Sequence, residues 1–218
     1  MNKKHSFQNY FVTPSNRFAY LVAQEVCKSP DLYNPLYLYG PAGVGKTHLL
    51  QAIGEVYQNQ QRTAIYISAN QFLEEMIRAI QTGANVEFRE KYHQVDILLF
   101  DRLQYVAGKE HTQKELFNIV EKRLSDHKQT VFAGNVHPSQ IPILDPELST
   151  CLTCGLCVEI PTPDFEGKAE IIYQKLKRHG LDWPLDACRY VALNISSGVN
   201  QIEGEINKIT AFSKLLKG

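Results

Sequence analysis

Short apolar runs alternate with longer amphipathic segments along most of the chain. The runs have the length of β-strands, which are therefore expected at 36–39, 64–68, 95–101, 131–133 and 157–160. The segments between them carry apolar residues at helical spacing, which predicts helices at 15–28, 46–57, 70–82 and 112–127. Strands joined by helices of this length favour right-handed crossovers and a mainly parallel sheet. The pattern therefore predicts an α/β fold.

Two of these helices carry finer signals. Phe18, Leu21, Val22 and Val26 share one face of the first helix, and we expect that face to be buried. Thr112 and Glu115 have the spacing of a capping box, so the helix that ends near residue 127 is expected to begin there.

The pattern changes after the Pro-Thr-Pro segment at 161–163. From Asp164 onward the sequence shows only helical periodicity, over 165–179, 184–195 and 200–216. We therefore expect an α/β subdomain formed by residues 1–163 and a small all-α subdomain formed by residues 164–218.

Composition narrows the classes of protein that fit. The 218 residues include 23 Lys and Arg against 23 Asp and Glu, whereas domains that hold duplex DNA by bulk charge are usually basic. No apolar stretch is long enough for a membrane-spanning helix, and no apolar segment of signal-peptide type follows the lysines near the amino terminus. We therefore expect a cytoplasmic protein with no membrane span.

The five cysteines are expected to be reduced thiols, because their number is odd and the chain has no secretory signal. Cys151, Cys154 and Cys157 form a C-x₂-C-x₂-C run, which resembles part of a zinc or iron–sulfur ligand set. A fourth thiolate would have to come from Cys27 or Cys188, both expected on apolar helix faces. We favour burial of these cysteines as small apolar side chains over a metal site.

One motif carries clear chemistry. Gly40, Gly45, Lys46 and Thr47 fit the pattern G-x-x-x-x-G-K-[ST] between an expected strand and an expected helix. Such a loop turns successive backbone N–H groups inward at a helix amino terminus, where polyphosphate binds. Lys46 is expected to neutralise the β- and γ-phosphates, and the Thr47 hydroxyl to bind Mg²⁺.

The strand at 95–101 adds a second element of this site. Asp101 directly follows the apolar run Ile97–Phe100, and a carboxylate in this position holds Mg²⁺ in proteins with this phosphate loop, usually through water. Hydrolytic members of the same class carry a second carboxylate directly afterwards, which polarises the attacking water. Arg102 occupies that position here, and a guanidinium cannot accept a proton.

Several blocks of the sequence resemble the AAA+ module of the bacterial replication initiator DnaA, in that family's order. They are Asn16–Ala19, Tyr33–Leu36, Gly45–Leu49, Val86–Tyr92, Ala107–Glu110 and Ile202–Gly204. The phosphate loop alone is unspecific, whereas the block Val86–Tyr92 separates DnaA-like proteins from other AAA+ modules. The resemblance implies a P-loop AAA+ fold with a helical lid, and ATP or ADP with Mg²⁺ as ligands.

The resemblance also implies a set of ligand-binding positions. Asn135 matches the polar sensor that follows the fourth strand. The nucleotide-binding set is Gly40, Gly43, Val44, Gly45, Lys46, Thr47, His48, Asp101 and Asn135. Ile77 and Lys109 match positions that contact single-stranded DNA in the family. Core packing for Ile77 and a solvated charge for Lys109 are the alternatives. His111 stands where the family tends to have a second cation, which weakens the expected contact with DNA.

Three catalytic positions depart from the family. Besides Arg102, Cys151 stands where the arginine finger is expected, and Asn200 replaces the lid arginine that senses the γ-phosphate. An arginine finger is worth about 10³ to 10⁵ in rate, so weak or absent hydrolysis is expected. The chain also ends where the family's lid ends, so no duplex-specific DNA binding is expected.

These observations favour a DnaA-like nucleotide-binding protein of chromosomal replication initiation or its regulation. Its expected partners are other AAA+ protomers, either copies of itself or a full-length DnaA-type initiator, with weak binding of single-stranded DNA. One alternative is an active Mg²⁺-dependent ATPase of helicase-loader type in which Glu110 or Glu115 replaces the missing base. Another is a metal- or redox-responsive binding module built on the run Cys151–Cys157.

Overall fold

The structure is a computed structural model that describes residues 5–195 and 199–215. The chain divides into two compact units. The first unit comprises the residues up to Tyr10, Phe18–Gly40 and Lys46–Glu159. The second comprises Phe11–Arg17, Pro41–Gly45 and the chain from Ile160 onward.

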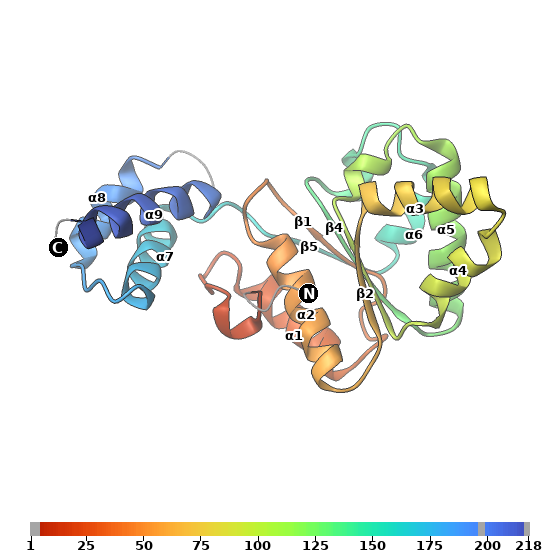
Figure 1. The fold of residues 1–218 in the computed structure, drawn as a ribbon, viewed down its shortest axis with the longest axis horizontal. Coiled ribbons are helices and arrows are strands. Elements are labelled where there is room, and N and C mark those ends of the chain that lie inside the picture. Colours follow the sequence, from red (N-terminus) through yellow and green to blue (C-terminus); the bar gives the residue numbers. More distant parts are fainter. Residues whose placement is uncertain (1–4, 196–198, 216–218) are drawn as a thin grey trace. The chain divides into compact units, whose positions relative to one another are not determined.

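The first unit is built on a five-stranded parallel sheet with the strand order β2-β3-β4-β1-β5 (Figure 1). The strands are β1 (Leu36–Tyr39), β2 (Ala64–Ser68), β3 (Ile97–Asp101), β4 (Gln129–Gly134) and β5 (Leu156–Glu159). Every position of β3 and β4 is buried, which confirms that the strand expected within 95–101 is covered on both faces, although it begins at Ile97.

Helices cover both faces of this sheet, α1 and α2 on one face and the other helices of the first unit on the opposite face (Figure 1). They are α1 (Arg17–Lys28), α2 (Lys46–Asn59), α3 (Ala69–Thr82), α4 (Asn85–Gln94), α5 (Glu110–Ser125) and α6 (Pro146–Thr153). Short 3₁₀ turns lie at η1 (Phe7–Asn9), η2 (Leu103–Val106) and η3 (Pro138–Gln140). The predicted α/β architecture is confirmed.

The second unit holds three helices within its described residues, α7 (Phe165–Arg178), α8 (Leu185–Leu193) and α9 (Val199–Leu215). Their apolar faces form one small core that includes Ile172, Leu176, Cys188 and Ile202. The expected all-α character of this part of the chain is confirmed.

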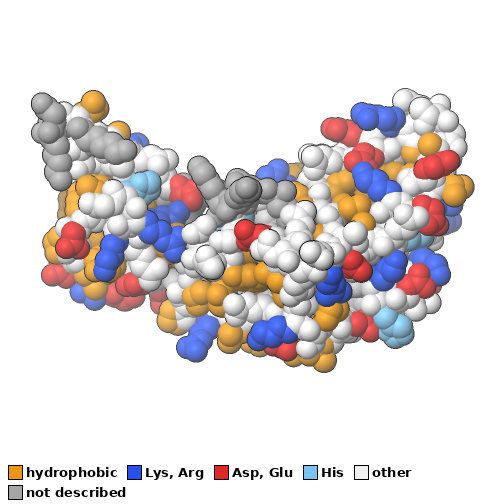
Figure 2. Space-filling model, turned by 60° about the horizontal axis from the view of Figure 1, so that its bottom comes forward, with side chains coloured by type: hydrophobic (Ala, Val, Ile, Leu, Met, Phe, Trp, Pro, Cys, Tyr) orange, Lys and Arg blue, Asp and Glu red, His pale blue; other side chains and the backbone are white. Residues whose placement is uncertain are grey.

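Charged side chains of both signs are interspersed on the surface, as the face in Figure 2 shows. This distribution agrees with the balanced count of acidic and basic residues. None of the helices among the described residues is both long enough and apolar enough to cross a membrane.

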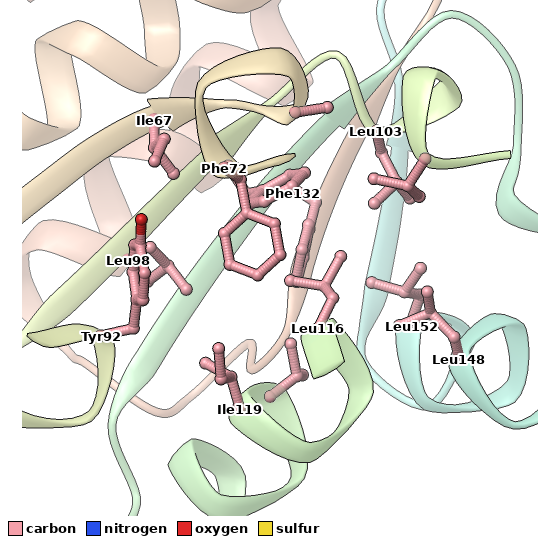
Figure 3. Packing of buried hydrophobic residues seen from close by; sticks show 14 of the residues in the cluster. Ile67, Phe72, Tyr92, Leu98, Leu103, Leu116, Ile119, Phe132, Leu148 and Leu152 are labelled. Atoms are coloured by element: carbon pink, nitrogen blue, oxygen red, sulfur yellow. The ribbon is translucent and has the colours of Figure 1, made fainter. Parts of the chain in front are cut away.

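Phe72 of α3 is central to the core on the face covered by α3 to α6 (Figure 3). Its ring centroid lies 5.3 Å from those of Phe88 and Tyr92 in α4 and 5.4 Å from that of Phe100 in β3. Such tilted aromatic contacts add to the burial of apolar area. The block Val86–Tyr92 therefore supplies core residues from a helix that periodicity alone did not predict.

One local prediction is wrong in part and another is wrong. Phe18 and Leu21 are 62% and 49% exposed, whereas Val22 and Val26 are buried as expected, because α1 packs through these two residues and through Ala19 and Ala23. The α5 helix begins at Glu110, so Thr112 lies inside its first turn and is buried there. Glu115 forms an ion pair with Arg89 and takes no part in a capping box.

Candidate functional site

Three predicted ligand positions lie at the same edge of the sheet. Gly40 directly follows β1, Asp101 ends β3, and Asn135 directly follows β4. These three strands are neighbours in the order β3-β4-β1 and run parallel, so their carboxyl ends meet. Open α/β sheets bind ligands at this edge. Asp101 is 1% exposed there, whereas Asn135 is open to solvent.

The loop after β1 has the backbone that its glycines predict. Gly43 and Gly45 adopt φ of 83° and 101°, in the left-handed region that residues with a Cβ rarely adopt. The α2 helix begins at Lys46, so the N–H groups of its first turn have no acceptor within the helix. Such N–H groups suit phosphate oxygens. The Val44 side chain is buried, so only the backbone of this residue is available to contact a ligand.

Lys46 places an ammonium group in a largely buried position beside this loop. Its Nζ donates a hydrogen bond of 2.6 Å to the carbonyl oxygen of Gly40. Burial lowers the pKa of Lys46 to about 8, an effect that the nearby Asp101 carboxylate opposes. Burying a cation is costly unless an anion accompanies it. A polyphosphate would add anionic charge beside this ammonium, so the residue fits the ligand that the motif predicts.

Thr47 and Asp101, the two predicted Mg²⁺ positions, are in direct contact. The Thr47 hydroxyl donates a hydrogen bond of 2.7 Å to Oδ2 of Asp101. Mg²⁺ prefers oxygen ligands and retains several waters, for which a hydroxyl and a carboxylate are suitable partners. These two residues therefore fit a hydrated Mg²⁺ carried by the nucleotide.

Tyr66 is a site residue that the sequence reading missed. Its hydroxyl donates a hydrogen bond of 2.7 Å to the same Oδ2 of Asp101. Burial, followed by the charge of Asp101, raises the pKa of Tyr66, so the hydroxyl remains a donor at neutral pH. The sequence offered one signal for Tyr66. Side chains alternate between the two faces along a strand, so Tyr66 lies on the same face of β2 as Ser68, the last residue of that strand.

His48 contacts the chain near its amino terminus. Its Nε2 lies 2.8 Å from the carbonyl oxygen of Ser6, and its ring centroid lies 4.9 Å from that of His5 and 5.2 Å from that of Tyr10. The imidazole therefore holds residues 5–10 against the start of α2. His48 lies in the first turn of that helix, so its backbone N–H, and not its side chain, is the group that suits the predicted ligand.

The position after Asp101 has no proton acceptor. Arg102 adopts the left-handed conformation (φ 60°, ψ 48°) and its side chain is exposed. Glu115, one of the two substitutes considered, accepts hydrogen bonds of 2.6 and 2.8 Å from Arg89 on its two oxygens. Both carboxylate oxygens of Glu115 are therefore already engaged by one guanidinium, which does not favour a role in activating water.

Cys151 is half-buried on α6, beside a groove of about 490 Å³ between α5 and α6. Phe117, Leu124 and Cys154 line the same groove. Cys27 and Cys188 are buried, as expected. Within residues 5–195 and 199–215, no three or more His, Cys, Asp or Glu side chains form a group that could hold a metal ion. The metal version of the cysteine alternative therefore finds no support in the geometry.

The cysteines are expected to differ in reactivity towards iodoacetamide, because the thiolate is the reactive form. Burial, and to a lesser degree Cys154 and Glu121, raise the pKa of Cys151 to about 11, so only about one thiol in a thousand is ionised there at pH 8. Cys154 is exposed and should be alkylated first. Alkylation of Cys151 should accelerate about tenfold per pH unit below pH 11. Peptide mass spectrometry after timed quenching checks this order, and faster labelling of Cys151 than of Cys154 at pH 8 would contradict it.

Ile77 lies on the outer face of α3 and is 45% exposed, so core packing is the wrong interpretation for it. Ile80 of α3 and Val86 of α4 are also exposed. Lys109 precedes α5 and is partly exposed.

Ion pairs hold α4 in place beside these residues. Arg89 of α4 pairs with Glu115 of α5, and Lys91 of α4 lies 2.6 Å from Glu75 of α3. The hydroxyl of Tyr92 also donates to Glu75, at 2.6 Å. The polar residues of the block Val86–Tyr92 therefore link α4 to α3 and α5, while Val86 stays exposed.

Asn200 is the second residue of α9, and its side chain lies outside the described residues.

The chain is similar to known proteins in both sequence and fold. The sequence model of the family described as the bacterial DnaA ATPase domain matches residues 1–159. A structure of the replication initiator DnaA bound to AMPPCP and single-stranded DNA is similar over 95% of this chain, with a TM-score of 0.92 and 36% identity. AMPPCP-bound DnaA from Aquifex aeolicus is similar over 95%, with a TM-score of 0.91 and 36% identity. The chain spans 65% of the length of each of these two structures.

A third structure, domain III of DnaA from Thermotoga maritima, is similar over the whole of this chain and 92% of its own length, with a TM-score of 0.92 and 34% identity. The DnaC helicase loader has a TM-score of 0.63 over 73% of this chain, but at 16% identity the likeness concerns the fold alone.

Proposed function

The chain belongs to the family of the bacterial DnaA ATPase domain, and from this premise we propose that it binds ATP or ADP with Mg²⁺ and acts in the initiation of chromosomal replication or its control. The observation that carries the proposal is the buried ammonium of Lys46 at the start of α2, beside the contact between Thr47 and Asp101. A cation and a pair of metal-type oxygen ligands in one place suit a magnesium polyphosphate.

Each residue of the site has a role in this proposal. The backbone N–H groups from Gly43 to His48 and the Lys46 ammonium hold the phosphates, while Gly40 and Val44 shape the loop. Thr47 and Asp101 hold the hydrated metal, which supplies charge neutralisation when bound. Asn135, at the end of the neighbouring strand, contacts the terminal phosphate. Residues 1–163 form the nucleotide-binding subdomain and residues 164–218 the lid.

Hydrolysis is slow in this proposal, because three groups that promote it elsewhere in AAA+ proteins are replaced. Arg102 cannot accept a proton from water, Cys151 carries no charge at neutral pH, and Asn200 offers a neutral amide in place of a guanidinium. The bound nucleotide then acts as a signal for assembly. We infer that the partners are AAA+ protomers in the cytoplasm, either copies of this chain or a DnaA-type initiator.

Contact with single-stranded DNA is a secondary part of the proposal. The exposed Ile77 of α3 and Lys109 before α5 are its candidate residues, and a related initiator structure contains such DNA. The chain has no excess of basic residues, and His111 stands where the family tends to have a second cation, so the interaction is weak and sensitive to salt.

The test measures binding and turnover on the same preparation. Titration calorimetry with ATP and ADP in Mg²⁺ is expected to show saturable binding of one nucleotide per chain. Turnover at saturating ATP should stay below about 0.01 s⁻¹, roughly a thousandfold under a typical enzyme. Absence of binding would exclude the nucleotide role, and turnover near 10 s⁻¹ would restore the alternative of an active ATPase of helicase-loader type.

A further inference from the structure

We propose that Tyr66 is a positioning residue for the metal site: its hydroxyl fixes the Asp101 carboxylate in the orientation that serves Mg²⁺. The inference rests on the proposed function, because it concerns the metal that accompanies the nucleotide.

Two hydroxyl groups meet on one oxygen atom of Asp101. Thr47 and Tyr66 each donate to Oδ2 at 2.7 Å. Two donors occupy the lone pairs of Oδ2, which leaves Oδ1 as the oxygen to serve a hydrated metal ion. A carboxylate held by a single hydroxyl can rotate about that bond, whereas two donors from different elements fix its plane.

The two donors come from different elements of the fold. Thr47 belongs to the first turn of α2. Tyr66 belongs to β2, which pairs with β3 so that Ser68 lies opposite Asp101 and Tyr66 lies opposite Leu99. The tyrosine therefore reaches along the sheet from the neighbouring strand to the carboxyl end of β3. Asp101 is almost fully buried, so rearrangement of its hydrogen bonds by solvent is restricted.

The direction of the Tyr66 hydrogen bond is itself fixed by Gln51. The Gln51 side chain is hydrogen-bonded to the Tyr66 hydroxyl, and its Oε1 lies 2.8 Å from Nδ1 of His5. Because the Gln51 oxygen faces His5, its amide NH₂ is the group that donates to Tyr66. The hydroxyl then accepts from Gln51 and donates to Asp101. Gln51 lies four residues after Thr47 and therefore on the same face of α2. This face holds the carboxylate directly through Thr47 and indirectly through Gln51 and Tyr66.

The experiment compares Tyr66→Phe with Tyr57→Phe. Tyr57 of α2 is a matched control, because its hydroxyl donates to the Val26 carbonyl oxygen at 3.3 Å and the variant removes the same atom away from Asp101. A fluorescent ATP analogue is titrated against each protein in EDTA and at graded Mg²⁺ concentrations. Electron paramagnetic resonance of Mn²⁺ in the presence of ATP measures metal binding directly, without turnover.

Tyr66→Phe is expected to bind the analogue in EDTA within twofold of the unaltered chain. The Mg²⁺ concentration for half-maximal tightening and the Kd for Mn²⁺ should rise about tenfold or more, the usual effect of losing a residue that orients a metal ligand. Tyr57→Phe should change neither value. Gln51→Leu, which keeps the tyrosine, should shift both in the same direction by a smaller factor.

Unchanged Mg²⁺ and Mn²⁺ dependence in Tyr66→Phe would overturn the inference and leave the proposed function intact. If Tyr66→Phe fails to fold, unchanged metal dependence in Gln51→Leu has the same meaning. Failure of the unaltered chain to bind nucleotide, with or without metal, would overturn the proposed function and this inference together.

Discussion

Replacing Arg123 with methionine is expected to lower the free energy of unfolding by roughly 3 to 5 kcal/mol. Arg123 lies on α5 and is fully buried, which is unusual for a charged side chain. Its guanidinium donates hydrogen bonds of 2.6 and 2.9 Å to the carbonyl oxygens of Tyr92 and Val95, and of 2.7 Å to that of Gln129. Methionine fills a similar volume but leaves these carbonyl oxygens without their donor.

The loss is large because one side chain joins three elements. The carbonyl oxygens of Tyr92 and Val95 lie at the carboxyl end of α4, where the last carbonyl groups of a helix find no N–H donor within the helix. The third carbonyl oxygen belongs to Gln129, the first residue of β4. Burial lowers the pKa of Arg123 to about 10, so the guanidinium stays charged at pH 7.

Lys122→Met is the matched control for Arg123→Met. Lys122 is adjacent on α5, exposed, and pairs with Asp126 at 3.0 Å on the surface, so its loss should cost at most about 0.5 kcal/mol. Urea unfolding followed by circular dichroism compares the two variants. Equal midpoints would show that Arg123 is not a structural link.

The backbone of the first unit was largely predictable from the sequence. The strands at 36–39 and 64–68 have the expected bounds, and α3 ends as expected at Thr82, where Gly83 takes the left-handed conformation (φ 71°). These features depend on local apolar runs and on glycine, which a single sequence displays directly. The helices α4 and α6 were not predicted from periodicity, because their apolar residues are too few for a clear pattern.

The tertiary contacts of individual side chains could not be predicted from the sequence. Lysine and arginine are normally exposed, so nothing local marks Arg123 as buried. Phe18 is apolar and at helical spacing, yet α1 packs closely through alanines and leaves this ring in solvent. In the candidate site, the loop and Asp101 follow from a motif, whereas Tyr66 comes from the adjacent strand and depends on the register between β2 and β3.

Replacing Lys46 with methionine is expected to weaken ATP binding at least about 100-fold while making the free protein more stable below pH 8. The first effect follows from the loss of a charge-assisted contact with phosphate, worth about 3 kcal/mol. The second follows from burial, which lowers the pKa of Lys46 to about 8, whereas an unfolded lysine titrates near 10.4. Below pH 8 the folded chain therefore bears the cost of a buried ammonium group.

The sign of the pH dependence separates this interpretation from a simple packing effect. Between pH 8 and about 10.4 the unfolded chain binds a proton at Lys46 that the folded chain has released, so this residue makes the unaltered protein more stable as the pH rises. Lys46→Met lacks that contribution. The difference in unfolding free energy between the two proteins should therefore shrink across this range, by an amount on the order of 3 kcal/mol.

Urea unfolding at pH 7, 9 and 10.5, beside calorimetry with ATP at pH 7, measures both effects of Lys46→Met. Tyrosine and cysteine ionisation affects both proteins alike and cancels in the difference. Lys128→Met is the control at a second lysine. Lys128 lies at the turn before β4, away from the loop after β1, so this variant should leave ATP binding unchanged. If Lys46→Met binds ATP as tightly as the unaltered chain, the ammonium is buried for a reason other than phosphate. If the variant is less stable at pH 7, the hydrogen bond from Lys46 to the Gly40 carbonyl oxygen outweighs the cost of burying the charge.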